Sequence, residues 1–110
     1  MKKIFPLALL GVVTFVGLIG FSIFSAKTKP HSVTLTWQAP VTGSGAKVTR
    51  YYIYRSTSRG GPYVKIGSST GLKYEDHIVQ SGRMYSYVVS AVDDHDRESK
   101  KSNETTAMIP

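Results

Sequence analysis

Cysteine is missing from this chain of 110 residues. Its absence excludes disulfide bonds, thiolate metal sites and a cysteine nucleophile. Acidic residues are scarce: the chain has 7 Asp and Glu but 14 Lys and Arg, which gives a net charge of +7. The basic residues are scattered, with Lys100-Lys101 as their longest run, so nucleic-acid binding is not expected. The charge indicates a well-solvated surface, or attraction to an anionic partner such as a lipid surface or an acidic polymer.

The motifs of common enzymes are also missing. The sequence holds neither a glycine-rich phosphate loop nor a serine nucleophile elbow. Its histidines, His31, His77 and His95, fall in expected linkers and loops. Glu75 and Asp76 are adjacent and would point to opposite faces of a strand, so they cannot act as a carboxylate pair. We therefore expect no enzyme, no catalytic residue and no cofactor.

One loop gathers possible metal ligands in Asp93-Asp94-His95-Asp96. Carboxylates and imidazole are suitable ligands, but the spacing matches no EF-hand loop. Contiguous ligands rarely converge on one ion, and aspartate readily adopts turn conformations. We expect a solvated hairpin tip and no metal.

The first 26 residues differ in kind from the rest. Lys2 and Lys3 precede Ile4–Phe24, a stretch without any charged residue. Its length suits a membrane-spanning helix, which needs about 20 apolar residues, and exceeds the usual apolar region of a signal peptide. Gly20-Phe21-Ser22 nevertheless offers a cleavage site. Residues 1–26 are thus expected to be an anchor helix crossing the membrane through residues 4–24, or a signal peptide. Both place the remainder outside the cytoplasm, membrane-anchored or secreted.

A polar linker is expected at residues 27–31 and a single domain at 32–110. The linker contains Pro30, which resists helix formation. Beyond it, short runs typical of strands alternate with turn residues, and no stretch has helical periodicity. The expected strands cover 33–37, 48–55, 63–66, 73–76, 84–92 and 104–109. This pattern predicts an all-β, two-sheet sandwich preceded by one apolar N-terminal helix.

Alternation leaves the inward face of the second run open. Tyr51 and Ile53 compete there with Tyr52 and Tyr54 for the core side.

Several segments match a known pattern in order and spacing. They are Val33-Thr34-Leu35-Thr36-Trp37, Tyr51-Tyr52-Ile53-Tyr54-Arg55-Ser56, Gly60-Gly61-Pro62-Tyr63, Tyr74-Glu75-Asp76, the run from Gly82 to Asp93, Glu98-Ser99 and Ser102-Asn103. Residues 32–110 therefore resemble an immunoglobulin-like fibronectin type III domain, in the style common in exported bacterial proteins. The usual first strand is nearly absent, since only Lys29-Pro30-His31 precede the second.

The resemblance implies roles for individual residues. It makes Trp37 the core tryptophan of the second strand and turns Tyr51, Ile53 and Val89 inward. Tyr85 resembles the tyrosine of the corner motif, whose hydroxyl bonds to backbone just upstream.

With Tyr51 and Ile53 inward, Tyr52 and Tyr54 would project from the outer face beside Val88. An exposed aromatic patch suits a protein partner or sugar stacking. We therefore expect an exported, non-catalytic module that binds a protein or polysaccharide through Tyr52, Tyr54 and Val88. The alternative is a structural spacer, or a subunit of an envelope assembly, without a ligand of its own.

Overall fold

Seven strands make up the part of the chain that the computed structural model describes, residues 23–41 and 45–110. They are β1 (Ile23–Lys29), β2 (Ser32–Trp37), β3 (Val48–Ser56), β4 (Val64–Ser69), β5 (Lys73–Asp76), β6 (Met84–Asp93) and β7 (Thr105–Met108). The expected all-β class is confirmed for these residues, among which there is no helix. Accordingly, nothing in this part of the chain has the helical length and apolarity that crossing a membrane requires.

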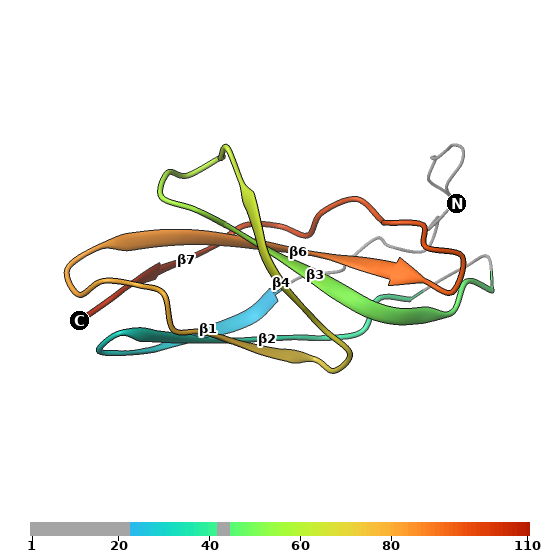
Figure 1. Cartoon of the computed structure of the whole chain (residues 1–110), viewed down its shortest axis with the longest axis horizontal. Helices are drawn as coiled ribbons and strands as arrows, with labels where there is room; N and C mark the ends of the chain where they lie inside the picture. Colours follow the sequence, from blue (N-terminus) through green and yellow to red (C-terminus); the bar gives the residue numbers. More distant parts are fainter. Residues whose placement is uncertain (1–22, 42–44) are drawn as a thin grey trace.

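The strands form two antiparallel sheets that face each other. One has the order β1-β2-β5 and the other the order β4-β3-β6-β7. Figure 1 shows them as layers, with β1, β2 and β5 along its lower side. Since each sheet buries one face against the other, this is the two-sheet sandwich that the strand pattern predicts.

The expectation of a nearly absent first strand is wrong. β1 pairs with β2 from Ile23 opposite Trp37 to Lys29 opposite Ser32. Residues 23–26, expected in the apolar helix, and residues 27–29 of the expected linker therefore belong to the sheet. β1 satisfies backbone groups of β2 that would otherwise form a free edge. The apolar run continues into β1 without a break, so the sequence pattern does not indicate where the strand begins. Residues 4–22 of the predicted anchor lie outside the described residues.

The core lies between the two sheets and contains Trp37, Tyr51, Ile53, Tyr85 and Val89. The rings of Trp37 and Tyr51 meet edge to face, with centroids 5.4 Å apart. This geometry is one that aromatic pairs prefer. Tyr51 and Ile53 thus take the inward side of β3, and the ambiguity of its alternation is resolved.

A tyrosine corner holds the start of β6. The backbone N–H of Gln80 donates to the Tyr85 hydroxyl at 3.0 Å. The bond runs to backbone five residues upstream, so it fixes the connection between β5 and β6.

One end of the sandwich gathers the β1–β2 turn, the β5–β6 connection and the C-terminus, on the left in Figure 1. Ile109 closes this end, since its carbonyl accepts from the N–H of Gly82 at 2.8 Å and its N–H donates to the carbonyl of Arg83 at 2.9 Å. Gly82 has φ 81°, in the left-handed region that favours glycine. The end of the β5–β6 connection is therefore tied to the C-terminal segment through two adjacent residues, Gly82 and Arg83.

Candidate functional site

The tyrosine face, the outer surface of the four-stranded sheet around Tyr52 and Tyr54, carries the residues predicted to bind. Tyr54 pairs with Val88 of β6, and Tyr52 pairs with Ser90. These side chains do share one face, but the expected exposed patch is not there. Tyr54 is only 9% exposed and Val88 only 5%, while Tyr52 is half-buried.

The segment 98–103 closes this face by pairing with the edge of β6. The N–H of Ser99 donates to the carbonyl of Ala91 at 2.8 Å, and that of Ser102 donates to the carbonyl of Val89 at 2.7 Å. In return the hydroxyl oxygens of Ser99 and Ser102 accept from the amides of Ala91 and Val89, both at 2.9 Å. The two serines thus replace a regular strand ladder and hold the segment against the sheet.

Glu98 fastens this segment over Tyr54. Its Oε2 accepts from the Ser90 hydroxyl at 2.6 Å and from the Tyr54 hydroxyl. Burial, together with this carboxylate, raises the pKa of Tyr54 to about 12. Burial acts to raise the pKa of Glu98, but the two hydroxyl donors and the nearby Lys101 and Lys65 outweigh it and lower that pKa. Lys101 completes the cover, with its Nζ 4.5 Å from the Tyr54 ring centroid.

Tyr52 is occupied by cations of the chain itself. The Nζ of Lys65 lies 3.6 Å from its ring centroid, and the guanidinium carbon of Arg50 lies at 5.4 Å. Arg50 also donates to the Tyr52 hydroxyl at 3.1 Å and to Asp96 at 2.9 Å. A sugar ring stacking on Tyr52 would compete with these cation–π contacts. The tyrosine face is therefore a closed, internally satisfied surface.

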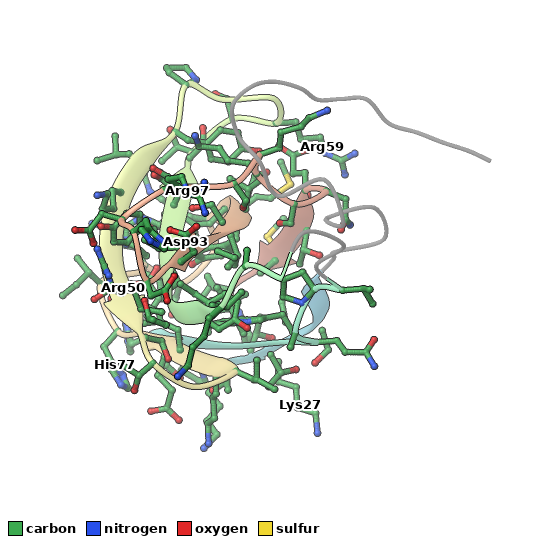
Figure 2. The ribbon with its side chains drawn as sticks, turned by 90° about the vertical axis from the view of Figure 1, so that its right-hand side faces the viewer. Lys27, Arg50, Arg59, His77, Asp93 and Arg97 are labelled. Atoms are coloured by element: carbon green, nitrogen blue, oxygen red, sulfur yellow. The ribbon has the colours of Figure 1, made fainter. Side chains whose placement is uncertain are left out.

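Asp93 organises the hairpin tip that was considered as a metal loop. Its carboxylate accepts from the backbone N–H of His95 at 2.9 Å, from the N–H of Arg97 at 2.8 Å and from the Arg97 guanidinium at 2.7 Å. Figure 2 shows Asp93 and Arg97 close to each other. Asp96 takes φ 60° in this turn, a conformation that aspartate tolerates.

The possible metal ligands of this tip do lie near one another. Asp93, Asp94 and His95 each bring one ligand atom within 4.8 Å of the others. However, Asp93 is fully buried and already accepts hydrogen bonds from the turn. Burial acts to raise its pKa, but the hydrogen bonds from Arg97 and His95 outweigh it and lower the pKa. The hydrogen bonds to the Asp93 carboxylate therefore account for the proximity of these side chains as part of a stable turn.

A buried polar network lies at the end of β5. The carboxylate of Asp76, 3% exposed, accepts from one Arg55 nitrogen at 3.0 and 2.9 Å, from the Tyr87 hydroxyl at 2.7 Å and from the Ile78 N–H at 3.1 Å. Burial first, and then the acceptor Asp76, raise the pKa of Tyr87. Since these four hydrogen bonds occupy both carboxylate oxygens, Asp76 joins β3, β6 and the β5–β6 connection at this end of the sandwich.

A hollow of about 460 Å³ opens at this end of the sandwich, and the sequence did not predict it. Its lining includes Arg55, His77, Ile78, Gln80, Arg83 and Tyr85. These residues come from β3, from the β5–β6 connection and from the start of β6, and they form no sequence motif. One signal was available: an isoleucine in a turn-rich connection, where it remains 76% exposed.

Among the relatives found by comparison with known proteins, two are amylopullulanases that share nearly half of the aligned residues with this chain. The chain is 48% identical over 62 residues to an amylopullulanase of Thermoanaerobacter thermohydrosulfuricus, which is 56% of this chain and 4% of that protein. It is 45% identical over 76 residues to an amylopullulanase of Thermoanaerobacterium saccharolyticum, which is 68% of this chain and 6% of that protein. The chain therefore corresponds to a short segment of each enzyme.

A solved structure matches over nearly its whole length. It is a Fn3-like protein from Clostridium thermocellum, 34% identical, with a TM-score of 0.62 over 83% of this chain and 88% of that one. No protein-family model matches the sequence. The two sheets, the tyrosine corner and this match agree with the resemblance seen in the sequence. The chain belongs to the fibronectin type III family.

Proposed function

We propose that the chain is a non-catalytic fibronectin type III module that works outside the cytoplasm in contact with a carbohydrate polymer. The observation that carries the proposal is the similarity, at 45 to 48% identity, to short segments of two enzymes named for carbohydrate polymers. The matched segment is only 4 to 6% of each enzyme. We therefore look for the function of the module on its own surface, since a fold shared by many proteins does not by itself define a function.

The chemistry of the described residues supports a non-catalytic role. Three carboxylates that are buried or lie against the sandwich are each engaged: Asp76 in an ion pair, Asp93 in a turn and Glu98 with two hydroxyls. A catalytic acid or base must be within reach of a substrate proton and free to exchange it. These three groups stabilise the sandwich instead.

The location outside the cytoplasm is supported by the apolar stretch Ile4–Phe24, whose last two residues are the first of β1. As a membrane anchor or as a signal peptide, it would lead to export. An alkaline phosphatase fusion at Pro110 tests this point, since that enzyme is active only where its disulfides form. We expect an active fusion, and an inactive β-galactosidase fusion at the same residue; the reverse pattern contradicts export.

Polymer contact is tested by native electrophoresis of the full chain in gels that contain pullulan or amylopectin. We expect slower migration than in a polymer-free gel, relative to serum albumin as the control protein. The same samples, incubated with each polymer, should release no reducing sugar. Reducing ends above a buffer control would contradict the non-catalytic role.

A second candidate function is a spacer without a ligand. The closed tyrosine face favours it, because Tyr54 and Val88 are buried and Tyr52 is covered by Lys65. A spacer would migrate at the same rate in all polymer gels. Unchanged mobility throughout would therefore replace the binding role with the spacer role.

A further inference from the structure

The hollow at the end of the sandwich combines positive charge with an exposed apolar side chain. Its volume of about 460 Å³ is within the range of small-ligand sites. Arg55, Arg83 and His77 line it, and its lining contains no aspartate or glutamate. It is therefore a shallow, open surface lined by cationic side chains, on a chain whose charge is already positive.

Arg55 is held in place at the hollow. One of its terminal nitrogens donates all of the side-chain hydrogen bonds seen among the described residues, to both Asp76 oxygens and to the Ile78 carbonyl at 2.9 Å. Its guanidinium also lies 5.7 Å from the Tyr85 ring centroid. Among the described residues no acceptor engages its other guanidinium nitrogens. A preorganised guanidinium with free donors is suited to a carboxylate.

Arg83 is the group at the hollow that is free to bind. Its side chain is exposed and makes no ion pair or hydrogen bond within the described parts of the chain, although its backbone is tied to Ile109 and to Gln80. His77 is partly compensated by Glu75, 3.3 Å away. The backbone ties fix where Arg83 leaves the turn, whereas its side chain gives up rotamer freedom when it binds.

The other side chains of the lining suit a sugar. Ile78 is 76% exposed and offers apolar surface for the C–H groups of a ring, and Gln80 offers an amide for hydroxyls. A membrane surface fits less well, because the chain enters β1 at Ile23, opposite Trp37, while the hollow adjoins Asp76, opposite Val33 at the other end of β2. With the chain anchored through residues before β1, the hollow would open away from the anchor.

We propose that this hollow binds carboxylate-bearing residues of an acidic polysaccharide, through Arg83 and Arg55 with Ile78 against the sugar ring. The inference rests on the proposed contact with carbohydrate and adds the ligand class and the site. An acidic peptide is the competing ligand, since it offers the same carboxylates without a sugar ring.

The test is native electrophoresis of the full chain, at 150 mM NaCl, in gels that contain polygalacturonate. Arg83→Gln should weaken binding about tenfold, the loss expected for one charge-assisted hydrogen bond. Arg59→Gln is the matched control, because it removes the same charge from an exposed arginine on another loop. Figure 2 shows Arg59 and His77 at opposite sides of the view. Equal effects of the two variants would show unspecific attraction and overturn the proposal.

Two further arms decide the ligand class. Ile78→Ser should weaken binding to polygalacturonate and leave poly-L-glutamate unaffected, since only the sugar uses the apolar contact. Tighter binding of poly-L-glutamate than of polygalacturonate would overturn the polysaccharide assignment in favour of a peptide.

Retardation by pullulan without any by polygalacturonate would contradict this inference but keep the proposed function. No retardation by any polymer would contradict both. Trp37 fluorescence confirms that each variant is folded.

Discussion

The tyrosine face and the end hollow use the same kinds of side chains in opposite ways. On the face, Lys65 and Arg50 lie on Tyr52, and Glu98 joins Tyr54 to Ser90. At the hollow, Arg83 is exposed and lacks a described partner. The difference teaches that aromatic and cationic residues indicate a binding surface only where the chain itself leaves their binding groups unused.

The carboxylates explain why the two surfaces diverge. The hairpin tip after β6 supplies Asp93 and Asp96, and the segment 98–103 supplies Glu98. These carboxylates bind the cations and hydroxyls around the tyrosine face. Beside the hollow lie Asp76, which Arg55 and Tyr87 saturate, and Glu75, which lies 3.3 Å from His77 and leaves Arg83 without a partner among the described residues. Because the chain has half as many acidic as basic residues, some cations have no acidic partner, and Arg83 at the hollow is one of them among the described residues.

The largest expected effect is at the floor of the hollow. Asp76→Ala should lower the free energy of unfolding by about 3 kcal/mol, because it leaves Arg55 and the buried Tyr87 hydroxyl without their acceptor. Urea unfolding followed by Trp37 fluorescence measures it. Glu75→Ala, on the same strand but exposed, should change it by less than about 0.5 kcal/mol. Similar losses for both would show that the buried network does not hold this end.

The next effect separates the two tyrosines of the tyrosine face. Tyr54→Ala should also cost nearly 3 kcal/mol, at about the low end for removing a buried aromatic ring. Tyr52→Ala should cost about 1 kcal/mol, since that ring is half-buried and loses mainly cation–π contacts. The same urea titration compares them. A larger loss for Tyr52 would mean that the face is open in solution.

A smaller, pH-dependent effect is expected at the hairpin tip. Asp93→Asn should cost about 2 kcal/mol at pH 7, through weakened hydrogen bonds to the charged carboxylate. The pKa of Asp93 is lowered in the folded chain, so its stabilisation is complete above the ordinary aspartate pKa and is lost as the pH falls through the folded pKa. The gap between wild type and variant should therefore shrink from pH 7 toward pH 2. Asp94→Asn is the control, and a gap independent of pH would contradict the role of the charge.

The smallest effect is expected at the rim of the hollow. Arg83→Gln should leave the free energy of unfolding within about 0.5 kcal/mol of wild type, because the side chain is exposed and unpaired among the described residues. Thermal and urea unfolding both measure it. A loss above 1 kcal/mol would make Arg83 part of the structural network and erase the contrast between the two surfaces.

Local sequence patterns determined most of the sandwich. Alternation located β2, which is half-buried, and the long run from Met84 located β6, which is buried on both faces. Turn residues separated the strands from β3 onward, because a tight turn favours glycine, aspartate or proline. The corner tyrosine followed from the family resemblance, and Tyr85 makes the bond implied for it. β1 was missed because its first residues continue an apolar run, so that only the pairing with β2 identifies it as a strand.

Burial on the outer face and the existence of the hollow were decided by the tertiary structure alone. The sequence put Tyr52, Tyr54 and Val88 on one face of the sheet, but alternation cannot tell an open face from one that a distant segment covers. Residues 98–103 cover it, and they are held there by hydrogen bonds between residues distant in the sequence, such as Ser102 and Val89. The hollow likewise joins Arg55 to Arg83, which lie far apart in the sequence and are brought together only when β3 pairs with β6.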